Sequence, residues 1–155
     1  MVSVGAVMCF AVFAVAAATD VQQCAGRNLP DLSDNVQLVP CKKVPCRLKK
    51  GTDQHITINF TPDKDVDEVK NHVSANVFGA ELPFIGVDGK SVCDQITTED
   101  GSATGCPLKA GTKYRYKDSF HVETFYPSIG VKVHWSLRDA NQEDITCFEV
   151  MARIS

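Results

Sequence analysis

Four histidines are the residues in this sequence that could carry acid–base or metal chemistry near neutral pH. His55, His72, His121 and His134 each occupy a polar position in a stretch of alternating polarity. A neutral imidazole can bind a metal ion or act as a general base, and it titrates in an acidic compartment. No recognisable nucleophile, base and orienting group accompany these residues, so we interpret them as surface histidines. We therefore expect no enzyme activity, no metal and no cofactor.

Two short stretches resemble ion-binding motifs incompletely. The sequence "GVDGKS" at 86–91 ends like a phosphate-binding loop, but Phe84 stands where that loop needs its first glycine. The sequence "DKDVD" at 63–67 starts like a calcium-binding loop, but Glu68 replaces the glycine that its sharp turn requires. Both stretches are interpreted as turns.

The first residues indicate where the protein resides. Residues 2–18 carry no charge, are rich in Ala, Val and Phe, and end in three alanines, the small side chains that signal peptidase requires. A membrane anchor is the alternative, but the run is short for a membrane span and lacks flanking basic residues. We expect a signal peptide over 1–18, cleavage before Thr19 and a mature domain over 19–155. The protein is then secreted, to the extracellular space or to the lysosomal lumen.

The cysteines of the mature chain predict disulfides. An even number of cysteines in an exported chain is typical of a disulfide framework, although composition alone permits many pairings. Pairs within 41–46 and within 93–106 could each close a short loop, which would leave Cys24 to join Cys147. No Cys-x-x-Cys pair exists, which disfavours a zinc site. The cysteines concerned are Cys24, Cys41, Cys46, Cys93, Cys106 and Cys147.

Apolar residues at every second position predict β-strands along the whole mature chain. The pattern is strictest from Ile129 to Arg138, whereas 79–111 is a loop rich in Gly, Pro and Asp, and 63–70 is the one candidate for a helical turn. About seven strands joined by turns predict a single all-β, immunoglobulin-like sandwich. The net charge of −3 is well mixed, which disfavours nucleic acid as a partner. Strands are expected over 36–39, 46–49, 54–61, 69–78, 113–125, 129–138 and 145–154.

Asn59 begins a glycosylation sequon, Asn-Phe-Thr, on the outward face of its predicted strand. We expect a glycan there; the alternative is an unmodified surface asparagine.

Several motifs together resemble one known family. They are "CRLKKG" at 46–51, the sequon within "INFTP" at 58–62, "LPF" at 82–84, "YPSIGVKVHWSLRD" at 126–139 and "CFEV" at 147–150. The mature chain resembles the secreted lipid-recognition (ML) domain family, specifically Niemann-Pick type C protein two and its arthropod relatives, which include the group two mite allergens. The resemblance covers nearly all of the mature chain and includes the order of the cysteines.

This resemblance implies a fold and a site. The two sheets would splay around an apolar cavity that takes one sterol, fatty acid or similar lipid, with Cys24 paired to Cys147, Cys41 to Cys46 and Cys93 to Cys106. The 93–106 loop is longer than in the vertebrate members, which leaves the choice of ligand open. The cavity mouth would be formed by Phe84, Val122, Tyr126 and Pro127. The walls, which follow from strand parity as much as from motifs, would be Ile56, Ile58, Phe60, Val73, Val77, Phe120, Val131, Val133 and Trp135.

We therefore predict a secreted, monomeric, non-enzymatic protein that binds and transfers a hydrophobic small molecule and contacts a membrane or receptor transiently. One alternative is a secreted recognition module for microbial lipids or semiochemicals, acting in immunity or chemical communication. Another is a filled sandwich that binds a receptor through its exterior, and a third is a secreted hydrolase of an ester substrate that depends on His121 and His134. Parity alone cannot separate the wall of a cavity from a packed core, because both are apolar on the inward face.

Overall fold

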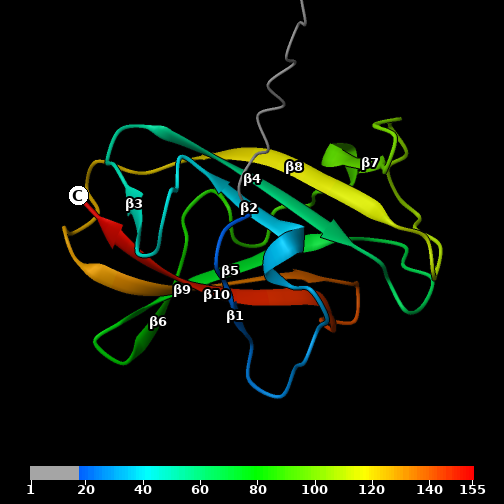
Figure 1. The fold of residues 1–155 in the computed structure, drawn as a ribbon, viewed down its shortest axis with the longest axis horizontal. Helices are drawn as coiled ribbons and strands as arrows, with labels where there is room; N and C mark the ends of the chain where they lie inside the picture. The colour runs from blue at the N-terminus through cyan, green and yellow to red at the C-terminus, as the bar shows by residue number, and fades with distance from the viewer. Residues whose placement is uncertain (1–17) are drawn as a thin grey trace, which may run out of the picture.

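The computed structural model describes residues 18–155, which form two β-sheets packed face to face (Figure 1). The predicted signal segment, apart from Ala18, lies outside the described residues. Within residues 18–155, no helix is long and apolar enough to cross a membrane. The all-β sandwich predicted from the alternating pattern is confirmed.

Each sheet is built mainly from antiparallel pairs. In Figure 1, β2, β4 and β8 form the upper layer and β5, β9 and β10 the lower layer. The short β3 pairs in parallel with the end of β10. The lower sheet has the order β1 (Gln22–Gln23), β10 (Asp144–Ile154), β9 (Gly130–Arg138), β5 (Lys70–Val77) and β6 (Ala80–Pro83), with β3 (Cys46–Leu48) beside β10. The upper sheet has the order β2 (Val36–Val39), β4 (Asp53–Phe60), β8 (Tyr114–His121) and β7 (Ile96–Thr98).

The register of the lower sheet aligns its inward side chains. Trp135 lies opposite Val73 on one side and Phe148 on the other, and Val133 lies opposite Ala75 and Val150. Because side chains alternate along a strand, these opposed residues form rows on the same face. The rows point toward the upper sheet and form its contact with the lower one.

Some local predictions were wrong. The predicted loop 79–111 contains β6, β7 and the short 3-10 helix η2 (Cys93–Gln95); a second one, η1 (Ser33–Asn35), precedes β2. All four residues of β6 are exposed, so this strand has no apolar alternation to detect. The segment 63–70 is not helical, because the backbone of Val66 pairs with that of Leu108.

Three disulfides tie the sandwich together. Cys24 is joined to Cys147 in β10 across a sequence separation of 123 residues. The two other bridges close short loops, Cys41–Cys46 between β2 and β3 and Cys93–Cys106 around β7. These are the pairings that the spacing favours and the resemblance implies.

Candidate functional site

The predicted wall residues meet between the two sheets. Apart from Val77 of β5, they are at most 8% exposed and belong to one hydrophobic cluster. Val77 is half-buried and packs against the edge of this cluster. Strand β10 adds inward residues that the wall prediction omitted, although the same alternation was visible there. The inward residues of β10 are Phe148, Val150, Ala152 and Ile154.

Two of the predicted mouth residues, Phe84 and Tyr126, are in contact. Phe84 and Val122 are buried, and Tyr126 packs against Phe84 with 5.3 Å between ring centroids. The Tyr126 hydroxyl accepts a hydrogen bond of 3.0 Å from the backbone N–H of Ile85, which links the two mouth segments. Burial raises the pKa of Tyr126, despite this hydrogen bond. Pro127 is exposed to solvent at the edge of this group.

Aromatic rings form a continuous row from the surface to the centre of the sandwich. Phe84 contacts Phe120 edge-on at 5.6 Å, Phe120 contacts Trp135 edge-on at 5.4 Å, and Trp135 stacks on Phe148 at 6.3 Å. At the outer end, Phe125 packs on Tyr126 and is itself 66% exposed. The row therefore connects the exposed ring of Phe125 with the buried ring of Phe148.

The inward side chains of the two sheets are closely packed in this structure. The pocket that opens between the sheets has a volume of about 10 Å³, which is room for roughly one water molecule. Ile56, Val87 and the aromatic row occupy the remaining space around it.

A chain of buried polar groups borders the same pocket. The Trp135 Nε1–H donates to Asn71 Oδ1 at 3.1 Å, and Asn71 Nδ2 donates to the Tyr116 hydroxyl at 3.1 Å. The Tyr116 hydroxyl in turn donates to Asp118 Oδ2 at 3.0 Å, and Lys90 Nζ lies 3.6 Å from the same oxygen. This chain crosses from the lower sheet to the upper sheet, and our site prediction missed it. The sign of this polar chain in the sequence was Asn71, a polar residue at an inward position of β5.

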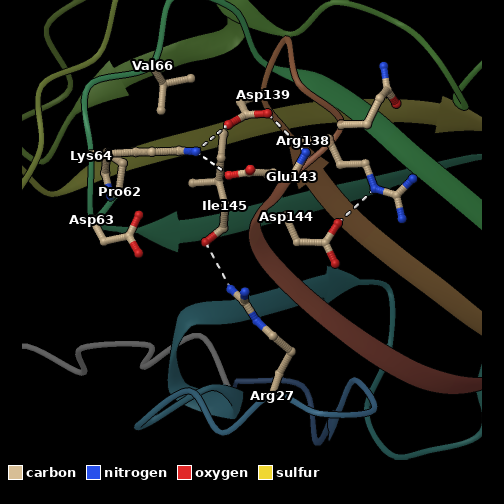
Figure 2. A pocket seen from close by; sticks show the side chains of 11 residues that line it. Arg27, Pro62, Asp63, Lys64, Val66, Arg138, Asp139, Glu143, Asp144 and Ile145 are labelled. Carbon is tan, nitrogen blue, oxygen red and sulfur yellow. Dashed lines mark hydrogen bonds and ion pairs between the residues drawn. The ribbon is translucent and has the colours of Figure 1, made fainter.

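A larger pocket of about 530 Å³ lies near the β9–β10 turn (Figure 2) and has a different character. Lys64 pairs with Asp139 at 3.1 Å and with Glu143, and Arg138 pairs with Asp144 at 2.7 Å. Two hydrogen bonds raise the pKa of Lys64, and the bond to Glu143 has a larger effect than the bond to Asp139. A lipid tail would bury little apolar surface among these paired charges, so this pocket is not the predicted site.

Two of the histidines meet on the outer face of the lower sheet. The rings of His72 and His134 are 5.9 Å apart, with Asp88 and Glu149 beside them. His134 also touches both sulfurs of the Cys24–Cys147 bridge. These sulfurs are not free thiolates, so this group of side chains does not make a thiolate metal site.

A comparison with known proteins gives the family. The sequence model of one protein family, the ML domain, matches residues 18–154 of this chain. The chain belongs to the ML domain family. The resemblance drawn from the motifs is thereby confirmed.

Similar proteins come from insects and vertebrates. The NPC intracellular cholesterol transporter 2 homolog a of Drosophila melanogaster is 28% identical over 99% of each chain. The NPC intracellular cholesterol transporter 2 of Danio rerio is 30% identical and covers 77% of this chain and 74% of its own length. The crystal structure of a Niemann-Pick type C2 protein from Japanese carpenter ant superposes with a TM-score of 0.66 at 25% identity, covering 77% of this chain and 89% of that one.

Proposed function

We propose that this ML domain protein binds a sterol, fatty acid or similar lipid between its two sheets and carries it without chemical change. The observation that carries the proposal is the aromatic row, which runs without interruption from exposed Phe125 to buried Phe148. The names of the fly and zebrafish relatives, both cholesterol transporters, support a lipid as cargo. A receptor for microbial lipids or semiochemicals would begin with the same binding step.

Binding requires the closed interior to open. Burying about 300 Å² of apolar ligand surface at about 25 cal/mol per Å² contributes roughly 7 kcal/mol. Part of that free energy offsets the lost freedom of the ligand and the separation of the walls. The mouth is the place to open, because Phe84 and Tyr126 lie on irregular segments after β6 and β8 and not within a strand.

Two further parts of the proposal concern export. Thr19, the first residue of the proposed mature chain, is 3% exposed and its Oγ1 accepts a hydrogen bond of 2.8 Å from the N–H of Leu38. This supports Thr19 as part of the folded domain, and the three disulfides favour an oxidising compartment, extracellular or lysosomal. We expect signal peptidase to cleave just before Thr19, and N-terminal sequencing of the secreted protein would test this.

We also propose that Asn59 carries a glycan. It is half-buried on β4, and its Oδ1 accepts a hydrogen bond of 3.0 Å from Arg115 Nε, which leaves Nδ2 as the atom that a glycan would modify. Protein secreted from insect cells should lose mass on treatment with an N-glycosidase. An Asn59→Gln variant should show no such change; an unchanged wild-type mass would refute this assignment.

The binding proposal is tested by native mass spectrometry of the purified mature protein. We expect one added mass per protein after incubation with members of a panel of sterols, fatty acids and neutral lipids. Protein purified from its own source should carry a mass of the same class. Absence of any adduct across the panel, with the disulfides intact, would contradict the proposal.

A further inference from the structure

Basic residues gather in one stretch of this otherwise acidic chain. Residues 35–52 contain five lysines and arginines and no Asp or Glu, although the whole chain has a net charge of −3. They belong to the loop between β2 and β3, to β3 itself and to the residues just after it. Positive charge is therefore concentrated at one place in the fold. The five residues are Lys42, Lys43, Arg47, Lys49 and Lys50.

A sixth basic residue joins this group from the other end of the chain. Arg153 of β10 lies directly beside Arg47 of β3, and both side chains are exposed on the same face of the lower sheet. The residue on the other side of Arg153 is Gly130, which has no side chain. Like charges that face each other on neighbouring strands are destabilising. An anion bound between the two guanidinium groups would remove this repulsion.

The positive charges face a groove and have no acidic partners. None of the six side chains forms an ion pair with an acidic side chain within residues 18–155. The groove has a volume of about 600 Å³ and lies between β3 and the start of β4. Its acidic lining residue, Asp53, is already paired with His121 at 2.7 Å. We call it the basic groove; its basic lining residues are Lys42, Lys43, Arg47 and Lys49.

The lining of the basic groove favours a chain-like polyanion over a membrane. The large apolar side chains that are exposed within residues 18–155 all lie outside this lining, so none is placed to insert into a bilayer there. Pro40, Cys41 and Pro45 supply rigid apolar surface against which the faces of sugar rings can pack. The Cys41–Cys46 disulfide closes the loop that carries two of the lysines, so less conformational freedom is lost when they bind.

We propose that the basic groove binds a sulfated polysaccharide. Its lysine ammonium groups pair with sulfates along the chain, and Arg47 and Arg153 hold one sulfate between them, because a guanidinium presents two parallel N–H groups to an oxyanion. The basic groove shares no lining residue with the predicted lipid site. The inference therefore goes beyond the proposed function and does not depend on it.

The probe is a heparin octasaccharide, titrated into the mature protein by calorimetry. We expect saturable binding that weakens as the salt concentration rises from about 0.1 to about 1 M, since ions screen exposed charges. A dextran of similar length, which has the sugar rings without sulfate, should not bind. Vesicles of phosphatidylserine and phosphatidylcholine measure the membrane alternative and should bind more weakly than heparin.

Two double variants remove charge from the basic groove. Lys42→Gln with Lys43→Gln, and Arg47→Gln with Arg153→Gln, should each weaken heparin binding about tenfold, the effect of losing two exposed ion pairs. All four side chains are exposed, so the fold should be unaffected. The arginine double variant should be at least as stable as the wild type in chemical denaturation, because it removes a repulsive pair.

Lys109→Gln with Lys113→Gln is the matched control, since it removes the same charge from lysines that are 72% and 49% exposed. These lysines lie just before β8, whose first residue pairs with the last residue of β4, whereas the basic groove borders the start of β4. The control should keep wild-type affinity for heparin. An equal loss in the control would mean that only net charge matters, and would overturn the proposal.

Other results would overturn it as well. They are the absence of saturable heparin binding by the wild-type protein, binding that does not respond to salt, and tighter binding to the phosphatidylserine vesicles than to heparin. Native mass spectrometry with the lipid panel is run separately on the same proteins. Failure of the basic groove therefore leaves lipid binding standing, and failure of lipid binding leaves the basic groove standing.

Discussion

Replacing Val133 by Trp should block the interior while leaving the fold in place. Val133 lies in the middle of β9, is 5% exposed, and faces the upper sheet between Ala75 and Val150. An indole at this position would occupy the space into which a lipid body must insert. The sheets that separate for a lipid should also separate for this side chain.

The magnitudes follow from packing. Adding volume to a closed core costs about 1–3 kcal/mol of unfolding free energy, because neighbours move off their preferred rotamers. If the indole displaces about a third of the roughly 7 kcal/mol that lipid burial contributes, affinity falls by about 2.3 kcal/mol, or roughly fiftyfold.

Two assays on each variant measure these effects. Chemical denaturation gives the loss of stability, and displacement of a fluorescent lipid gives the affinity. Lys132→Trp is the matched control, since Lys132 is the preceding residue of β9 and its side chain, 48% exposed, points outward. The control should retain wild-type affinity, and Val133→Phe should give an intermediate loss.

Two results would refute this reasoning. A folded Val133→Trp protein with wild-type affinity would mean that the lipid binds elsewhere. Global unfolding of both Val133→Trp and Val133→Phe would mean that the sheets do not separate, as in the alternative of a permanently filled sandwich.

The other predictions concern stability. Replacing Cys24 and Cys147 by Ala should lower the unfolding free energy by about 5 kcal/mol, and replacing Cys41 and Cys46 should lower it by about 2 kcal/mol. The difference arises because the entropy that a disulfide removes from the unfolded chain grows with the sequence separation, which is 123 residues for the first pair and 5 for the second. Denaturation curves in the absence of reductant measure both losses. Above pH 10 the unfolded chain releases the Tyr116 proton while the folded protein keeps it, so stability should fall by about 1.4 kcal/mol per pH unit from this group; Tyr116→Phe should make the fall shallower in pH-dependent denaturation. Burial first, and the charge of Arg138 second, lower the pKa of His72, so its protonation favours the unfolded chain; stability should decline as pH drops below about 6.5, and His72→Gln should reduce that decline.

Parity along the strands predicted which side chains face inward but not how they contact each other. Val131, Val133 and Trp135 were placed correctly because alternation in β9 is strict. The close packing of the interior was not predictable in this way. Phe120 and Trp135 come from β8 and β9, which belong to different sheets, and their contact depends on the distance between the two sheets. No spacing in the sequence encodes that distance. A wall and a filled core have the same pattern.

The elements and residues that were missed have local physical reasons. Strand β6 is exposed along its length, and β7 has three residues, so neither has enough alternation for recognition. Asn71 faces inward in β5, as Val73 does. A polar residue at an inward position is visible in the sequence. Its partner Tyr116 comes from β8 in the other sheet, so the polar chain becomes visible only when the two sheets are placed face to face.

The central claim is that lipid binds between the sheets, and Trp135 reports on it directly. This is the chain's single tryptophan, 3% exposed and in contact with Phe120 and Phe148 inside the sandwich. Titration with a brominated lipid, whose heavy atoms quench indole fluorescence only at contact, should quench Trp135 saturably at one lipid per protein. Lipid binding by native mass spectrometry with unchanged Trp135 emission would contradict the claim.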